Sequence, residues 1–470
     1  MQKLCITLTV FASLAGAQTW QPLTNQPTFD ASVALQLTDG TVMVQAIESG
    51  TWWRLTPDSS GDYVNGTWSK LASMPSGYTP LYFASAVIPD GRVVVNGGEY
   101  NGGDSIVETN LGAIYNPVSN TWKKLVGPTG WSEIGDAQSA VLSNGTYMLG
   151  NCCSSQQALL DATTLTWTIT GTGKADANSE EGWTLLPDGT VLTVDVDDAP
   201  NTERYNPTSG TWSTAGKTPT SLAEYSEMGP AILRPDGTVF ATGASGATAI
   251  YTPGPGGAVG TWTAGPEFPM EGGKQLDVAD GPGALLPNGD VLVVASPGAY
   301  ETPSYFFEFD GTNLNSVPGT PNAPHDSSYY GRMLVLPTGQ IFFTDGSTDV
   351  EVFTGPGTYN SAWAPVIKAA PKTVTPGSTY KIEGVRFNGL SQGSAYGDDA
   401  QSATNYPLVR ITVNGIVYYC RTADFSSMAV ASPSLVSAHF AVPSSVPAGS
   451  GELVVVANGI PSAPVAVTVN

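Results

Sequence analysis

The chain has 470 residues, of which only 12% are charged, and it contains 54 glycines and 36 prolines. This composition excludes helix bundles and coiled coils, which are rich in Ala, Glu, Lys and Leu. A content of 41% hydrophobic and 9% aromatic residues excludes a disordered chain. The formal net charge of −22 disfavours nucleic acid and anionic membrane surfaces as partners. A turn-rich, all-β globular protein remains.

The first residues have the pattern of a secretory signal. Lys3 supplies the positive start, Leu4 to Leu14 form an apolar run, and Ala15-Gly16-Ala17 is the small-residue cleavage site. We therefore expect residues 1–17 to be removed and the mature protein to be secreted, without membrane insertion. Three cysteines then remain, too few for a disulfide scaffold, so the fold must depend on its hydrophobic core.

An apolar run that ends in a turn recurs seven times at intervals of about 50 residues. Six of the seven turns are Asp-Gly or Asn-Gly, which favour the positive φ angles of a type I′ hairpin. The spacing fits a kelch-type propeller blade better than the shorter WD40 repeat. The turn glycines are Gly40, Gly91, Gly145, Gly189, Gly237, Gly289 and Gly339.

The outer half of the repeat is a second strand pair that ends in a tryptophan, as in the segments that lead to Trp122, Trp167, Trp212 and Trp262. Together these patterns predict a seven-bladed β-propeller of four-stranded blades over residues 18–362. Trp20 lies before the first inner strand, and we expect its segment to complete the last blade and close the ring.

From residue 363 to residue 470 the pattern changes to six segments of alternating apolar and polar residues separated by Gly and Pro turns. This pattern predicts a small β-sandwich of immunoglobulin-like size. Residues 389–406 interrupt it as a long polar insertion that contains Tyr396-Gly397-Asp398-Asp399.

With this architecture the chain resembles the galactose oxidase/kelch superfamily. The local match is Tyr329-Tyr330-Gly331 before an inner-strand run, where the copper oxidases of the family carry Tyr-His. The hairpin at residues 421–427 resembles the loop that reaches into the propeller channel and carries a second copper-binding histidine. The resemblance implies a C-terminal immunoglobulin-like E-set domain and a working face where the inner strands begin.

The residues depart from the copper chemistry of that family. Tyr330 stands where the resemblance places a histidine, and residues 421–427 contain none. The chain has two histidines, His325 and His439, whereas a copper site of this type needs two imidazoles. We therefore expect no radical-copper site.

The position nine residues before each turn glycine predicts the residues that ring the channel mouth, subject to a one-residue slip. These positions are Ala31, Tyr82, Asp136, Glu180, Met228, Asp280 and Tyr330. The candidate catalytic residues are Asp136, Glu180, Asp280, Tyr329 and Tyr330. The candidate ligand-binding residues are Tyr82, Tyr100, Cys152, Cys153, Glu181 and Glu227.

Clustered carboxylates are consistent with several kinds of site. They could share protons as an acid/base pair, bind a hard cation such as Ca²⁺, or act as the two carboxyl groups of a glycosidase. They could also have no function, because in a chain with 40 acidic residues some must fall near any chosen face. Adjacent Cys152 and Cys153 could form a disulfide at the binding face or remain buried thiols, and we expect Cys420 to be free and buried.

Tyrosine faces beside polar groups are typical of sugar binding, because the ring packs on the C–H face of a pyranose. The preferred hypothesis is an extracellular, monomeric protein that binds a glycan or another small molecule without copper chemistry. The alternatives are a glycosidase or lyase, a copper oxidase with other ligands, and a structural propeller that binds proteins.

Overall fold

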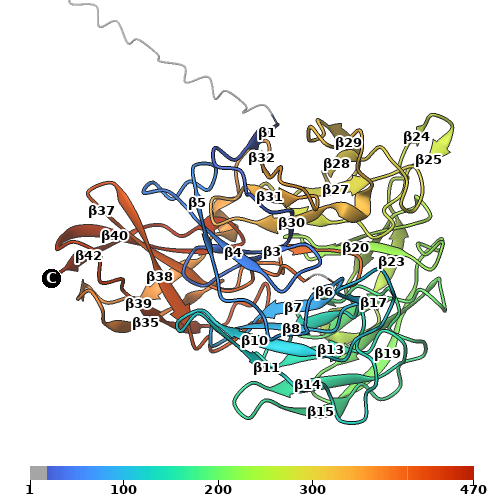
Figure 1. The fold of residues 1–470 in the computed structure, drawn as a ribbon, viewed down its shortest axis with the longest axis horizontal. Helices are drawn as coiled ribbons and strands as arrows, with labels where there is room; N and C mark the ends of the chain where they lie inside the picture. Colours follow the sequence, from blue (N-terminus) through green and yellow to red (C-terminus); the bar gives the residue numbers. More distant parts are fainter. Residues whose placement is uncertain (1–17, 400) are drawn as a thin grey trace, which may run out of the picture.

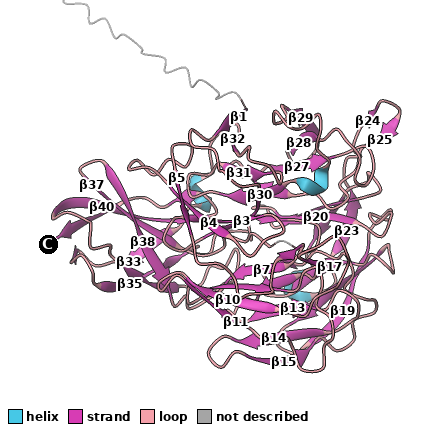
Figure 2. Ribbon diagram, viewed as in Figure 1, coloured by secondary structure: helices cyan, strands magenta, loops and turns pink. Residues whose placement is uncertain are grey.

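The computed structural model describes residues 18–399 and 401–470, so the predicted signal at 1–17 lies outside the described residues. Strands and loops make up nearly all of this part of the chain (Figure 2). Three short 3₁₀ turns are the helical elements: η1 (Pro255–Gly257), η2 (Ser328–Tyr330) and η3 (Ser361–Trp363). Within the described ranges, none of the helices has the length and apolarity to cross a membrane.

Seven sheets form the blades of a β-propeller, which confirms the predicted fold class (Figure 1). Blades one to four are β2 (Ala31–Gln36), β3 (Val42–Ala46), β4 (Trp52–Thr56) and β5 (Thr67–Lys70); β7 (Ala84–Val87), β8 (Val93–Asn96), β10 (Gly112–Asn116) and β11 (Thr121–Lys124); β12 (Ser139–Val141), β13 (Tyr147–Gly150), β14 (Gln157–Asp161) and β15 (Thr166–Thr170); and β16 (Thr184–Leu185), β17 (Val191–Val194), β18 (Asn201–Asn206) and β19 (Thr211–Lys217).

The other three blades follow the same antiparallel plan. They are β20 (Met228–Leu233), β21 (Val239–Gly243), β22 (Ala249–Thr252) and β23 (Thr261–Ala264); β26 (Gly283–Leu285), β27 (Val291–Ala295), β28 (Tyr305–Phe309) and β29 (Leu314–Val317); and β30 (Arg332–Val335), β31 (Ile341–Thr344) and β32 (Glu351–Thr354) with β1 (Thr19–Pro22). Two short pairs lie in loops: β6 (Pro80–Leu81) with β9 (Tyr100–Asn101), and β24 (Met270–Glu271) with β25 (Lys274–Gln275).

The ring closes as predicted, because β1 pairs with β32 and so completes the last blade. The Trp20 ring packs against Phe306, Phe343 and Phe353, and its indole N–H donates to the carbonyl of Pro318 at 2.6 Å. Trp20 therefore also links the last blade to blade six.

Tryptophans on the outer strands connect neighbouring blades through hydrogen bonds. The indole N–H of each donates to the preceding blade or its flanking loop: Trp68 to Asn25 O, Trp122 to Ala72 O, Trp167 to Val126 O, Trp212 to Gln157 Oε1 and Trp262 to Thr202 Oγ1. These contacts explain why a tryptophan recurs at this place in the repeat.

We expect Trp20→Ala to lower the free energy of unfolding by about 2 to 3 kcal/mol, which is less than full burial would give because the ring is only partly buried. Thermal and urea denaturation of the mature protein measure this loss. Trp20→Phe keeps most of the apolar contact and should cost about half as much. Equal losses for the two variants would contradict the role of the indole in closing the ring.

The hairpin turns differ from the prediction. In the first blade Gly40 has φ +79°, whereas Asp39 is not in the positive-φ region that a type I′ turn needs at both central residues. Gly40 N donates to Leu37 O and Leu37 N donates to Thr41 O, which makes a three-residue loop with a left-handed glycine. The Asp39 carboxylate accepts from Thr41 N at 3.1 Å, so the aspartate caps the loop and adopts ordinary φ.

The C-terminal strands form one nine-stranded sheet, which lies at one side of the propeller (Figure 1). The predicted boundary at 362/363 falls between β32 and β33, and the immunoglobulin-like assignment stays a prediction. The strands of this sheet are β33 (Val366–Ala369), β34 (Thr373–Val374), β35 (Thr379–Val385), β37 (Leu408–Val413), β38 (Ile416–Ala423), β39 (Val436–Ala441), β40 (Gly449–Ala457), β41 (Ile460–Pro461) and β42 (Val465–Val469).

This domain docks on the face of the propeller that carries the hairpin turns. Thr422 N donates to Thr38 O at 3.0 Å, and Met428 N donates to Ser143 O at 2.9 Å. The hairpin at 421–427 therefore contacts the turns of the first three blades and lies at the opposite end of the inner strands from the predicted site. Its predicted resemblance to a loop that reaches the site is wrong.

The polar insertion at 389–406 enters the channel instead. Its short strand β36 (Ser394–Ala395) pairs with the inner strand β26 of blade six. The Ser402 hydroxyl donates to Ala34 O in blade one, and Leu185 N in blade four donates to Gln392 Oε1. The insertion thus contacts inner strands around the ring and runs along the channel.

Candidate functional site

A cavity of about 410 Å³ opens at the channel mouth, on the face where the inner strands begin. Carboxylate and phenol side chains supply most of its wall. The lining residues are Glu48, Leu81, Tyr82, Glu99, Tyr100, Gly103, Asp104, Asp136, Glu180, Glu227, Asp280, Tyr300, Tyr329, Tyr396 and Asp398.

The start of the inner strand positions the predicted carboxylates. Asp136, Glu180, Asp280 and Tyr82 all line the cavity, each nine residues before a turn glycine. Tyr82, Glu180 and Asp280 share a left-handed backbone, with φ of 49°, 55° and 50°. Non-glycine residues seldom adopt this conformation, and such backbone strain concentrates at functional sites.

The remaining predicted positions do not line the cavity. Ala31 and Met228 are buried in their blades. In blade five the neighbouring Glu227 lines the cavity in place of Met228, which is the one-residue slip that the prediction allowed. Tyr330 stacks on Tyr329 with ring centroids 4.2 Å apart and stays 40% exposed, so Tyr329 is the residue of the pair that lines the cavity.

The carboxylates lie close enough to act together. One carboxylate oxygen from each of Asp136, Glu180 and Asp398 lies within 4.8 Å of the others, and Glu180, Glu227 and Asp280 form a second such group. Glu180 belongs to both groups. Five carboxylates, four from four different blades and one from the insertion, therefore make one continuous cluster.

Sequence reasoning assigned no role to Asp398. The residue sits at the inner end of the insertion, where Tyr396 O–H donates to Tyr329 O at 2.8 Å. Space for this end exists because Gly182 has no side chain: a Cβ there would lie 2.4 Å from Gly397 O. The polar sequence Tyr396-Gly397-Asp398-Asp399 could have marked this segment as functional. Its position at the cavity, however, depends on contacts between residues that are far apart in the sequence.

Burial and mutual repulsion raise the pKa values of these carboxyl groups. The pKa of Glu180 lies well above its usual value because of burial and then the charges of Asp136 and Asp280. The pKa values of Asp136, Asp280 and Asp398 are raised for the same two reasons. A bound proton, or a cation that offsets the neighbouring negative charges, would therefore stabilise each of these carboxyl groups.

Tyrosines form the other part of the wall. Tyr300 O–H donates a hydrogen bond to Glu227, and its ring meets Tyr329 edge-on with centroids 5.1 Å apart. Tyr82 and Tyr100 meet edge-on at 6.1 Å, which keeps both phenols at the cavity. Tyr300 was not predicted, although it lies in the loop after the second strand of blade six, as Tyr100 does in blade two.

Behind this wall lies Arg332, which is buried. Its guanidinium lies 3.7 Å from the centroid of Tyr396 and donates to Tyr329 O at 2.7 Å. It is absent from the cavity lining, so it supports the insertion and does not face the cavity.

Glu181 differs from its predicted role as a ligand-binding residue. Strand alternation and the left-handed backbone of Glu180 turn it away from the cavity, where it accepts from Lys174 Nζ at 2.9 Å. Lys174 also bonds Asp176 and Glu203, and Asp195 lies 3.9 Å from it. This buried cluster ties the loop before blade four to that blade.

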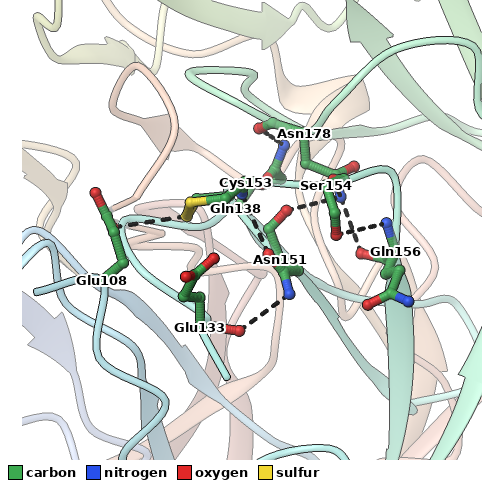
Figure 3. The surroundings of a disulfide bond; sticks show 9 residues. Glu108, Glu133, Gln138, Asn151, Cys153, Ser154, Gln156 and Asn178 are labelled. Carbon is green, nitrogen blue, oxygen red and sulfur yellow. Dashed lines mark hydrogen bonds between the residues drawn. A yellow bond between two sulfur atoms is a disulfide. The ribbon is translucent and has the colours of Figure 1, made fainter. Parts of the chain in front are cut away.

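Cys152 and Cys153 form a disulfide, so the disulfide alternative is confirmed (Figure 3). Cys420 is free and buried, as expected. Neither cysteine of the pair lines the cavity. A Cβ at Gly135 would lie 2.4 Å from Cys152 Sγ, which places the disulfide behind the segment that carries Asp136.

Asn178 connects the disulfide loop to the cluster. Its side-chain amide donates to the carbonyls of Asn151, Ser154 and Gln156, as Figure 3 illustrates, and it lies two residues before Glu180. The loop therefore supports the segments that carry Asp136 and Glu180 from outside the cavity lining.

The last blade carries a separate acidic group. Glu351 is fully buried with both carboxylate oxygens unpaired, and burial followed by the charges of Asp349 and Asp345 raises its pKa to about 8. The folded protein thus binds this proton more tightly than the unfolded chain, whose Glu has a pKa of 4.5. The resulting stability is complete below pH 4.5 and is lost as pH rises through 8.

We expect Glu351→Gln to raise the free energy of unfolding by about 2 kcal/mol at pH 9 and to change it little at pH 5. Urea denaturation across this range measures the difference. A variant whose stability parallels that of the parent protein at every pH would contradict the raised pKa.

The donor set does not fit the copper site that the resemblance implies. No imidazole lines the cavity in the described part of the chain. His325 is exposed on a loop, and His439 pairs with Asp424 in the C-terminal domain. Carboxylate and phenol oxygens suit hard cations, whereas copper sites of this kind use nitrogen ligands.

No family model and no curated protein matches the chain. Among solved structures it resembles a fungal alcohol oxidase of the AA5 family in complex with copper, with a TM-score of 0.55 and 15% identity over 97% of this chain and 100% of that chain. The fold is that of a galactose-oxidase-like propeller. A catalytically inactive virginiamycin B lyase from Staphylococcus aureus with quinupristin matches with a TM-score of 0.51 and 10% identity over 72% of this chain and 99% of that one. At these identities the likeness concerns the fold alone.

Proposed function

We propose that this protein is a secreted carbohydrate-binding propeller of the kelch type, monomeric and without radical-copper chemistry. The observation that supports this function best is an open cavity at the channel mouth whose wall combines tyrosine rings with carboxylate oxygens. A tyrosine face packs on the C–H face of a pyranose, and carboxylates accept hydrogen bonds from its hydroxyls.

The charge of the wall limits the kind of sugar. The lining contains carboxylates and no Lys, Arg or His. A uronate or a sulfated sugar would meet uncompensated repulsion, so the ligand is a neutral or an amino sugar. We therefore do not expect a lyase that acts on uronates.

A glycosidase is the second candidate, favoured by one observation. Asp136 and Glu180 are neighbouring carboxyl groups in the cavity, with one oxygen of each within 4.8 Å of the other, and retaining glycosidases act through a pair of carboxyl groups about 5 Å apart. Release of reducing sugar that stops in Asp136→Asn would favour catalysis over binding alone.

Tyr100→Ala tests the binding function, because Tyr100 lines the cavity at its outer part. We expect the mature protein to bind neutral or amino sugars on a glycan array, and the variant to bind the same sugars about tenfold more weakly by calorimetry. Ile169→Ala, on an exposed outer strand, is the control. An array without bound glycans, with or without Ca²⁺, would contradict the proposal.

A further inference from the structure

The spacing of three carboxylates at the cavity floor matches that of a hard-cation site. Oxygens of Asp136, Glu180 and Asp398 lie within 4.8 Å of one another. Oxygen ligands of Ca²⁺ lie about 2.3–2.6 Å from the ion, so two of them are separated by at most about 5 Å. One ion between the three groups would therefore reach all of them.

Asp398 supplies an observation that is independent of the blade carboxylates. It is 2% exposed, it comes from the C-terminal domain through the channel, and its Oδ2 has no hydrogen-bond partner. A buried carboxylate oxygen without a partner is costly, and a bound cation would remove this cost. The insertion thus carries an unsatisfied ligand atom to the lining of this cavity.

The basic side chains near the cluster are engaged elsewhere. Arg332 contacts Tyr396 and the carbonyl of Tyr329, and Lys174 serves the buried group around Glu181. Arg332 also acts electrostatically on Asp280 from behind the wall. Among the described residues, however, no Lys, Arg or His lines the cavity itself.

We propose that Asp136, Glu180 and Asp398 bind a Ca²⁺ ion, with Glu227 and Asp280 as the adjoining carboxylates that share Glu180. The all-oxygen donor set suits a hard cation, and carboxylates from separate segments suit the flexible coordination of Ca²⁺ better than the strict octahedron of Mg²⁺. One consequence of this site rests on the proposed function: a cation at the floor of the cavity would offer open coordination positions to the hydroxyl groups of a bound sugar.

Metal binding by the mature protein, freed of metal by chelation, tests this inference without any sugar. We expect Tb³⁺ to bind with luminescence sensitised by the tyrosines of the cavity, and Ca²⁺ to displace it at one ion per chain. Asp398→Asn, which keeps the shape of the side chain, should weaken Ca²⁺ binding about tenfold or more, because it removes one ligand charge. Saturating Ca²⁺ should also raise the Tm of the parent protein more than that of the variant.

Glu452→Gln is the matched control, because Glu452 is exposed on β40 in the C-terminal domain. It should bind Ca²⁺ like the parent. Equal affinities for the parent and Asp398→Asn, or absence of sensitised Tb³⁺ luminescence, would overturn the site. Asp136→Asn gives a second reading if Asp398→Asn fails to fold. Sugar binding that persists in chelator would refute the part of the ion in sugar binding, and Ca²⁺ binding without sugar binding would refute only the carbohydrate function.

Discussion

Lys174→Met should lower the free energy of unfolding by about 3 to 5 kcal/mol. The Lys174 side chain is fully buried and bonds Asp176, Glu181 and Glu203. Methionine fills a similar volume but leaves these carboxylates in a buried site without their cation. Urea denaturation at neutral pH measures the loss.

Lys274→Met is the control for this prediction, because Lys274 is exposed and lies 3.5 Å from an equally exposed Glu301. Surface ion pairs contribute little, so we expect a change below about 0.5 kcal/mol. Similar losses for the two lysine variants would show that Lys174 does not hold the buried group together.

Tyr396→Ala should destabilise the protein by about 3 to 5 kcal/mol and also abolish ligand binding at the cavity. Its ring covers Arg332 and its hydroxyl holds Tyr329 O, so alanine leaves a cavity beside a buried guanidinium. The end of the insertion then loses its anchor, and Asp398 is no longer held beside Asp136.

Tyr396→Phe separates the two contributions of this side chain. It keeps the ring over Arg332 and removes only the hydrogen bond to Tyr329, so we expect a loss of about 1 kcal/mol and retained binding. Denaturation and calorimetry on both variants check this. Full binding by Tyr396→Ala would mean that the insertion does not shape the site.

Local sequence patterns predicted the features that depend on local structure. The seven turn glycines predicted the seven blades, and the segment of Trp20 predicted how the ring closes. The fixed distance from turn to strand start placed Asp136 and Asp280 at the cavity, because every blade begins at the same level.

Features set by long-range contacts were missed. Asp398 reaches the cavity because the insertion runs through the propeller channel. The alternating apolar and polar residues of the C-terminal strands do not indicate where this insertion goes. Glu181 was predicted to face the cavity, but the left-handed backbone of Glu180 turns the Glu180 side chain inward and the Glu181 side chain away from the cavity. A sequence pattern does not reveal this local backbone conformation. The hairpin at 421–427 was expected to enter the channel because it resembles a loop of the copper oxidases, whereas the insertion at 389–406 enters it.

A crystal structure of the mature protein grown with CaCl₂ tests the central claim most directly. We predict that residues 389–406 run through the channel and that the carboxylates of Asp136, Glu180 and Asp398 surround one ion at its mouth. An insertion that lies outside the channel, with Asp398 in solvent, would contradict this account of how the site is built.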